Sequence, residues 1–325
     1  MSPDPSEFDR RRFIAAGAPV LAGSWIGAGT ACAAAQAAPP SSPRVLRIAH
    51  FCDVHLQPEK RAPDGLARAL SDAQERFSPD LVLNGGDQVM DVMGADRARS
   101  ARLFDLWQSV MKQECSVPLV NVIGNHDVFG WNTEKSGASP DDPGYGKRWA
   151  MDVFGLVAPY YVLDRGGWRI VVLDSTHPVE GGGSYTARLD EVQFDWLRDT
   201  LEQTPADQPI LVVSHIPILA ACAFFDGENE KSGDWLVPGA WMHLDARRIK
   251  DLFRRHPNVK LCVSGHIHLA DVVRYLGVTY ACNHAVCGSW WDGARDEFPP
   301  AYAIIDLHAD GSFTNQIVDW GWKPG

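Results

Sequence analysis

Residues 119–127 read Leu-Val-Asn-Val-Ile-Gly-Asn-His-Asp, a short apolar run that ends in a glycine and three polar residues. Similar short runs recur along the chain and alternate with longer segments of helical period. One such segment places Leu66, Leu70, Ala73 and Phe77 on a single helical face. The alternation predicts an α/β fold in which helices separate the strands of the sheets.

Six central strands are expected from the apolar runs, at residues 45–51, 81–83, 119–123, 170–173, 210–213 and 261–263. Further helical faces are expected within residues 103–111, 194–201 and 249–253. Residues 301–318 alternate between apolar and polar, and we expect them to form closing strands of the same domain.

Five of these expected strands are followed by His, Asp or Asn. The segments are Asp53-Val54-His55, Gly85-Gly86-Asp87, Gly124-Asn125-His126-Asp127, Ser214-His215 and Gly265-His266-Ile267-His268. Each segment alone could be an ordinary turn or contain a buried structural histidine. Ligands bind at the carboxyl ends of strands in open α/β sheets, so we expect the five segments to meet.

The five segments together contain three carboxylates, five imidazoles and one amide. Gathering these groups in one pocket requires compensation for desolvation and for repulsion between like charges. Divalent cations provide that compensation, and a donor set of nitrogen and oxygen suits Mn, Fe, Zn or Co. A carboxylate shared by two ions about 3.5 to 4 Å apart would form a dinuclear site, for which Asp87 is the expected bridge.

The order of these motifs resembles the calcineurin-like metallophosphoesterase superfamily, over residues 48–268. The resemblance implies a four-layer αββα sandwich, the metallo-dependent phosphatase fold, with the active site at the C-terminal ends of the strands. It implies one metal ion at Asp53, His55, Asp87 and His268, and a second at Asp87, Asn125, His215 and His266. It also implies two catalytic residues: His126 near the leaving group, able to protonate the departing oxygen, and Asp127 orienting His126.

The expected activity is hydrolysis of phosphoester bonds by a metal-activated water or hydroxide. Asp53-Val54-His55 resembles the branch that hydrolyses cyclic nucleotides and glycerophosphodiesters, which favours phosphodiesters. Met90 stands where purple acid phosphatases carry a tyrosine, which disfavours a purple iron site. The alternatives are a phosphomonoesterase (an acid or alkaline phosphatase, or a nucleotidase), a non-catalytic metal-binding scaffold, and a peptide or acyl hydrolase with a different dinuclear site. A serine hydrolase built on Ser214 is disfavoured because no Gly-x-Ser-x-Gly motif is present.

Substrate choice is expected to depend on the loops at residues 127–145, 220–239 and 283–292. Within the last loop, Asn283 and His284 are candidates for contact with a phosphoryl oxygen. Trp290 and Trp291 are candidates for stacking on a base or covering an acyl chain, and the alternative is that both tryptophans belong to the core.

Residues 1–38 have the layout of an export signal. Arg10-Arg11-Arg12-Phe13 precedes a weakly apolar stretch rich in Ala and Gly, which resembles a twin-arginine signal. Residues 39–43 would be a short linker and 44–325 a single metallophosphoesterase domain, periplasmic or extracellular after export. An uncut membrane anchor and lipidation of Cys32 remain alternatives.

The composition limits the partners. With 30 Lys and Arg against 41 Asp and Glu, the net charge is −11, which argues against a nucleic-acid polymer and is compatible with a small phosphoester bound through cations. No segment after the signal is apolar over a membrane-spanning length. The six cysteines after Cys32 are expected to be buried thiols, although a disulfide between Cys282 and Cys287 is an alternative. The oligomeric state is not determined by the sequence.

Overall fold

The structure is a computed structural model that describes residues 42–325, all of which belong to one compact unit. The expected export signal, Cys32 and the first part of the linker lie outside the described residues. Within the described range, no helix combines the length and the apolar character needed to cross a membrane.

The first sheet has five strands in the order β13-β12-β1-β2-β3. They are β1 (Arg44–Phe51), β2 (Leu81–Asn84), β3 (Leu119–Asn121), β12 (Ala301–His308) and β13 (Phe313–Asp319). Strands β1, β2 and β3 run parallel, and β12 joins β1 in antiparallel orientation. The carboxyl ends of the three parallel strands therefore lie at one edge of the sheet.

The second sheet has six strands in the order β10-β11-β9-β8-β5-β4. They are β4 (Tyr161–Arg165), β5 (Trp168–Val172), β8 (Ile210–Val213), β9 (Val259–Ser264), β10 (Asp271–Tyr275) and β11 (Val278–Cys282). The four inner strands are parallel, and each edge strand pairs in antiparallel orientation. A separate hairpin consists of β6 (Thr176–Pro178) and β7 (Tyr185–Ala187).

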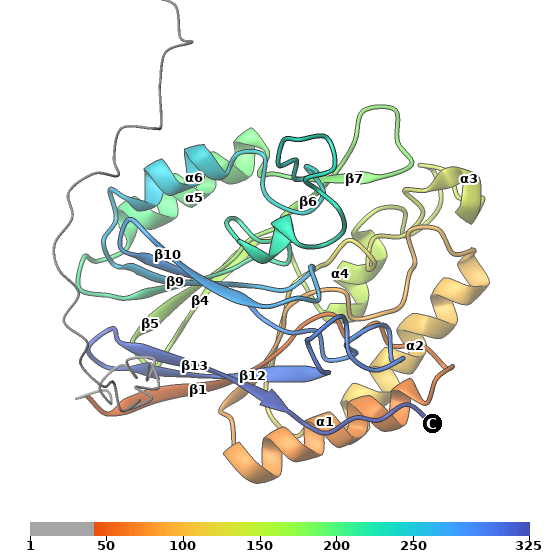
Figure 1. The fold of residues 1–325 in the computed structure, drawn as a ribbon, viewed down its shortest axis with the longest axis horizontal. Coiled ribbons are helices and arrows are strands. Elements are labelled where there is room, and N and C mark those ends of the chain that lie inside the picture. The colour runs from red at the N-terminus through yellow and green to blue at the C-terminus, as the bar shows by residue number, and fades with distance from the viewer. Residues whose placement is uncertain (1–41) are drawn as a thin grey trace, which may run out of the picture. The chain divides into compact units, whose positions relative to one another are not determined.

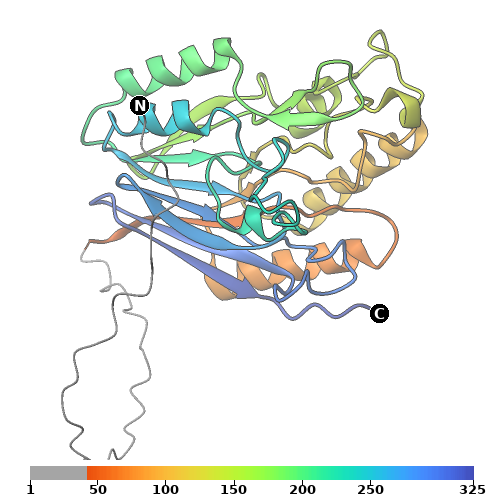
Figure 2. The ribbon, with the colours of Figure 1, turned by 45° about the horizontal axis from the view of Figure 1, so that its top comes forward.

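The two sheets pack face to face between two layers of helices (Figures 1 and 2). The core between the sheets contains Ile48 and Leu83 from the first sheet and Ile170 and Val213 from the second, all almost fully buried. Helices α1 (Ala62–Phe77) and α2 (Arg97–Glu114) cover the first sheet, while α5 (Glu191–Gln203) and α6 (Ala246–Phe253) cover the second. The predicted four-layer αββα sandwich is therefore confirmed.

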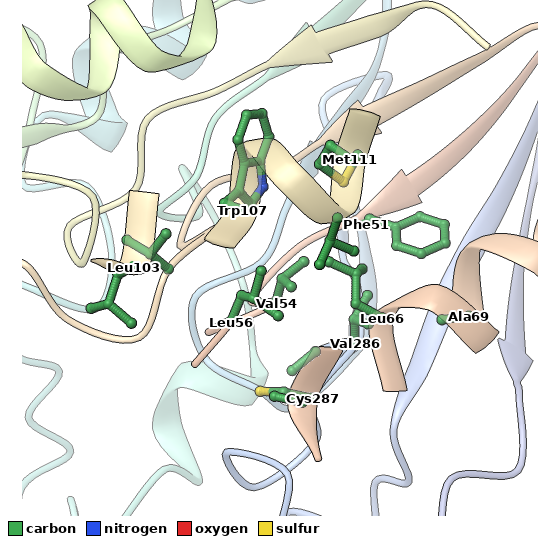
Figure 3. Close-up of a cluster of buried hydrophobic side chains, with 14 of the residues drawn as sticks. Phe51, Val54, Leu56, Leu66, Ala69, Leu103, Trp107, Met111, Val286 and Cys287 are labelled. Carbon is green, nitrogen blue, oxygen red and sulfur yellow. The ribbon is translucent and has the colours of Figure 1, made fainter. Parts of the chain in front are cut away.

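The outer layers bury the helical faces expected from the sequence. Leu66 of α1 and Leu103 and Trp107 of α2 lie in the same apolar cluster as Phe51 of β1 (Figure 3). The shorter helices α3 (Thr133–Ser136), α4 (Arg148–Phe154) and the 3-10 helix η1 (Cys222–Phe224) lie in connecting segments. Burial of these apolar faces is the main force that holds the helices on the sheets.

The six predicted central strands are all present, with bounds within two residues of the expected ones. The closing strands are confirmed as β12 and β13. The sequence did not indicate β4, β10 or β11, or the hairpin of β6 and β7. Strands β4 and β10 are edge strands with partly exposed, charged faces, so they lack the continuous apolar run that marks a central strand.

All six cysteines in the described part of the chain are free, and five of them are buried. The prediction of buried thiols is confirmed for five of the six, Cys115 being partly exposed, and the alternative disulfide between Cys282 and Cys287 is not formed. The Cys282 thiol donates instead to the Gly265 carbonyl, with Sγ 3.3 Å from the oxygen.

Candidate metal centre

The strand ends turn sharply where the predicted ligands lie. Five of these residues have left-handed backbone conformations: Asp53 (φ 53°), His55 (φ 44°), Asp87 (φ 53°), His266 (φ 76°) and His268 (φ 62°). Non-glycine residues rarely adopt this conformation, which persists only where the surrounding structure enforces it. The turns after β1, β2 and β9 therefore direct the side chains of these five residues toward a common site.

Hydrogen bonds tie these turns together. The Asp53 amide donates to the Gly86 carbonyl (3.0 Å) and the His55 amide to the Asp87 carbonyl (2.9 Å), which joins the ends of β1 and β2. The His266 amide donates to both carboxylate oxygens of Asp53, at 3.0 and 2.8 Å. This last contact connects the first sheet with the second.

A first group of donors converges around the imidazoles of His55 and His268, whose Nε2 atoms are 3.0 Å apart. Asp87 Oδ2 is 3.6 Å from His55 Nε2. Asp53 Oδ1 is 3.7 Å from His268 Nε2. All four side chains are almost completely buried.

A second group surrounds His215. Its Nε2 lies 3.2 Å from Asp87 Oδ2 and 3.1 Å from Asn125 Oδ1. His266 Nδ1 lies 3.3 Å from the same His215 atom. Asp87 Oδ2 therefore faces both groups, as expected of a shared ligand.

The spacing of these atoms fits divalent metal ions. Ligands about 2.1 Å from a common ion, at tetrahedral or octahedral angles, are about 3.0 to 3.4 Å apart. The distances are 3.1 to 3.3 Å in the second group and 3.0 to 3.7 Å in the first, which is slightly wider. The buried thiol of Cys287 also lies close to His55 and His268, but burial raises its pKa well above the usual value. Nitrogen and oxygen donors therefore dominate the site.

Backbone carbonyls orient the imidazoles. His268 Nδ1 is 2.6 Å from the Gly288 carbonyl, and His215 Nδ1 is 2.9 Å from the Gly85 carbonyl. In the neutral form of each ring, a proton on Nδ1 makes this hydrogen bond and leaves the Nε2 lone pair directed at the other candidate metal ligands. This arrangement prepares a histidine to bind a metal ion.

Neighbouring charges within the site shift one another's pKa values. Burial opposes ionisation of Asp87, but His215 and His126 hold the pKa of its carboxyl well below the usual range. Burial would lower the pKa of His215, yet the Asp87 carboxylate outweighs that effect and raises it to about 9. Burial lowers the pKa of His266 to about 3 and that of His55 well below its usual value. The last two imidazoles are therefore neutral at physiological pH, the form that binds metal ions.

The structure corrects the contact expected of Asp127. Its carboxylate accepts hydrogen bonds from the amides of Gln88 (2.9 Å), Val89 (3.2 Å) and Gly124 (2.9 Å). The His126 ring is held elsewhere, with Nδ1 2.6 Å from the Met90 carbonyl. Asp127 thus joins the loops after β2 and β3 and does not touch the ring that it was expected to orient.

A cavity of about 140 Å³ opens onto the site. Its lining includes polar residues of the predicted motifs: His55, Asp87, His126, His266 and His268. Its remaining wall, described here as the outer wall, consists of Tyr185, Asp226, Trp241, Ile267, Trp290 and Arg295. A small phosphoester could reach the convergent donors through this opening.

Residues 46–270 match the family model of the calcineurin-like phosphoesterases. The chain belongs to this family. The phosphoesterase is 28% identical to a protein of Synechococcus sp. named "Probable cyclic nucleotide phosphodiesterase", over 84% of this chain and 91% of the relative. It is 24% identical to the 3′,5′-cyclic adenosine monophosphate phosphodiesterase CpdA of Escherichia coli strain K12, over 46% of this chain and 50% of that protein. A dimetal phosphatase from Danio rerio shares its fold, with a TM-score of 0.58 at 15% identity over 86% of this chain and the whole of the other.

The phosphoesterase places its two candidate tryptophans differently. Trp290 lies in the outer wall, with its ring centroid 4.8 Å from that of His268. Trp291 is 1% exposed, packs against Trp322 in the outer apolar core, and donates its indole N–H to the His55 carbonyl (3.1 Å). Contact with substrate remains possible only for Trp290, and the core interpretation applies to Trp291.

Asn283 and His284 do not line the cavity. The Asn283 side chain is 1% exposed and exchanges hydrogen bonds with Asn315, with Asn283 Oδ1 accepting at 2.8 Å. Its Nδ2 also lies 2.9 Å from His50 Nδ1. His284 Nδ1 lies 3.1 Å from the Pro299 carbonyl. These contacts and their absence from the cavity lining argue against contact of the two residues with a phosphoryl oxygen.

Sequence reasoning missed four residues of the outer wall: Tyr185, Asp226, Trp241 and Arg295. Asp226 lies in a loop that was expected to influence substrate choice, but none of the four belongs to a motif. Tyr185 comes from β7, and burial together with the nearby carboxylate of Asp87 raises the pKa of its phenol. The phenol is therefore a hydrogen-bond donor at neutral pH.

Proposed function

We propose that this phosphoesterase hydrolyses phosphodiesters at a dinuclear metal centre. The observation that carries the proposal is the position of Asp87 Oδ2, 3.6 Å from His55 Nε2 in one donor group and 3.2 Å from His215 Nε2 in the other. Relatives named as cyclic nucleotide phosphodiesterases support a diester substrate, with 3′,5′-cyclic nucleotides as the first candidates.

The proposed ligand sets are those expected from the sequence. One ion would be bound by Asp53, His55, Asp87 and His268, and the other by Asp87, Asn125, His215 and His266. Two divalent ions of Mn, Fe or Zn would supply an activated water or hydroxide and would neutralise the phosphoryl oxygens of the substrate.

His126 is the proposed proton donor to the leaving group. It lines the cavity, and its side chain is 27% exposed. Because Nδ1 is held by the Met90 carbonyl, Nε2 is the ring atom available to a departing oxygen. Asp127 supports this role indirectly, by fixing the loop that carries His126.

The first test compares initial rates of the Mn-loaded protein on a chromogenic phosphodiester and the matching monoester. We expect a higher kcat/KM for the diester and a loss of at least about 100-fold in Asn125→Ala, because one ligand of the second ion is removed. Gln203→Ala is the matched control, since Gln203 is an exposed amide at the end of α5 that does not line the cavity, and its replacement should leave the rates unchanged.

A monoester preference would replace the diester proposal with a phosphomonoesterase. Failure to hydrolyse either ester, in a protein that binds two ions per chain, would favour the non-catalytic scaffold. Inhibition by phosphate and vanadate is expected for either esterase and would argue against peptide or acyl hydrolysis.

We also propose that residues 1–38 direct export through the twin-arginine route and that residues 44–325 act outside the cytoplasm. Fusion of residues 1–43 to a reporter protein tests this. We expect export of the reporter, and its retention in the cytoplasm when Arg10 and Arg11 are both replaced by lysine. Export that is unaffected by the double replacement would contradict the twin-arginine assignment.

A further inference from the structure

Arg295 is the one cationic side chain in the outer wall, and it lies next to the metal centre without belonging to either ligand set. Its Nη2 donates to Asp226 Oδ1 at 2.6 Å. Its guanidinium carbon lies 5.6 Å from the ring centroid of Trp290, and Trp290 in turn contacts His268. A single indole therefore separates the guanidinium from a proposed metal ligand.

The position of the guanidinium is fixed from both sides. The Arg295 amide donates to the Phe298 carbonyl and the Phe298 amide to the Arg295 carbonyl, each at 2.9 Å. On the opposite loop, Asn229 Nδ2 donates to the carbonyls of Ala223, Phe224 and Asp226 at 3.1, 3.1 and 3.2 Å. The ion pair thus joins two locally ordered loops, and its geometry is prepared before any substrate enters.

Part of the hydrogen-bonding capacity of Arg295 is unused. Its Nε is buried and has no partner among the described residues. An arginine side chain carries five N–H donors in a rigid fork. Few of those of Arg295 have a hydrogen-bond partner among the described residues. Nε does not face the cavity, but Arg295 lines it and its side chain is 31% exposed, so other N–H donors of the fork can reach a substrate oxygen.

The charge of Arg295 is largely cancelled. The Asp226 side chain is 16% exposed and that of Arg295 is 31% exposed, so solvent does not fully screen the contact. A neutralised pair attracts a dianionic phosphomonoester only weakly, whereas an unpaired guanidinium would attract it strongly. The pair still donates hydrogen bonds to an ester or sugar oxygen, which carries no full charge.

We propose that Arg295 binds the second ester group of a phosphodiester and that Asp226, by cancelling its charge, disfavours phosphomonoesters. The inference rests on the proposed phosphodiesterase function and assigns the diester preference to two residues outside the metal ligands. Arg295 is a specificity-determining residue in this scheme, and Asp226 is its positioning residue.

The test uses the Mn-loaded full chain and the variants Arg295→Ala, Arg295→Lys and Asp226→Asn. Loss of a charge-assisted hydrogen bond predicts a rise of about tenfold to a hundredfold in KM for the chromogenic diester in Arg295→Ala, with kcat little changed. Arg295→Lys retains the charge but not the fork, and should give a smaller rise.

Asp226→Asn is expected to strengthen the binding of anions. The uncompensated guanidinium should bind inorganic phosphate several-fold more tightly than in the parent protein, and KM for the monoester should fall. Phosphate binding is measured by isothermal titration calorimetry as well as by inhibition. Arg295→Ala should weaken phosphate binding or leave it unchanged.

Arg248→Ala provides a matched control. Arg248 forms a bidentate ion pair with Glu191, with Nη1 2.6 Å from Oε1 and Nη2 2.8 Å from Oε2. Neither residue lines the cavity. This variant should leave KM and phosphate binding unaltered.

The results distinguish substrate recognition by Arg295 from a purely structural role of its ion pair with Asp226 in joining the two loops. Both Arg295→Ala and Asp226→Asn break the same ion pair, so a structural link would change KM and phosphate binding in the same direction in both variants. Such a common shift, or no shift in metal-loaded Arg295→Ala, would overturn the inference. If the parent protein hydrolyses neither ester, the proposed function fails, while phosphate titration of the three variants still decides the role of the pair.

Discussion

Asp87→Asn should lower kcat/KM for phosphoesters by at least about 10³-fold, a loss typical of central catalytic groups. Asparagine preserves the shape of the side chain but removes the charge that both donor groups share through Oδ2. The neutral amide cannot bridge two cations as a carboxylate does, so the number of bound ions should fall below two per chain. Activity assays and metal analysis after gel filtration measure both effects.

The control for this variant is Asp164→Asn. Asp164 accepts two hydrogen bonds from Arg169, at 3.0 and 2.9 Å, on the exposed edge strand β4. Its replacement should change neither metal content nor rate. Retention of two ions and of activity within tenfold of the parent in Asp87→Asn would contradict the bridging role of Asp87.

Gly124→Ala is expected to abolish metal binding at the bridging position although Gly124 supplies no ligand. A Cβ at this position would lie 2.1 Å from Asp87 Oδ1 and 2.2 Å from the Asp87 amide nitrogen, far closer than atoms can approach. Asp87 cannot yield easily, because its Oδ1 accepts the His126 amide at 2.8 Å. We expect a free energy of unfolding lower by about 1–3 kcal/mol, as for other overpacked sites, together with loss of activity.

Gly94→Ala serves as the comparison. A Cβ on Gly94 would have its nearest neighbours at 3.5 Å, an ordinary van der Waals contact. Thermal unfolding and metal analysis of the two variants, prepared in parallel, isolate the collision with Asp87. Full metal content in Gly124→Ala would show that the loop after β3 adapts to the added methyl group, which would contradict a rigid site.

The sequence predicts the positions of the candidate ligands well because they follow strands whose burial is evident from the sequence. The predicted central strands are three to eight residues long with mainly buried side chains, so their ends are marked by an abrupt change in polarity. The topology of parallel strands then brings these ends together without any knowledge of the loops. Asp53, Asp87 and His215 could be placed in one site by that argument alone.

The outer wall of the cavity could not be predicted from the ends of strands. Arg295 and Asp226 meet across 69 residues of chain, and each lies in an irregular loop that no periodicity describes. Their contact depends on tertiary structure, whereas a strand end depends on local burial. Arg295 also stands three residues beyond the loop that the sequence singled out, at 283–292.

Proximity in sequence was misleading for Trp290 and Trp291. Both have left-handed backbone conformations, with φ of 47° and 73°, and this turn sends the two rings in different directions. One ring enters the cavity wall and the other enters the core. Composition alone cannot distinguish the neighbours, because an indole suits either environment.

The contact between Asp53 and His266 has a consequence for the order in which the protein assembles. These residues are 213 positions apart in the chain, and the two sheets that carry them must already be packed before the contact can form. Closing so long a loop costs entropy that a few side chains cannot offset, so such contacts form late in folding. We therefore expect the ions to bind a nearly finished protein. Once bound, they would act as a removable cross-link between distant parts of the chain, much as a disulfide does, and a chelator should speed unfolding.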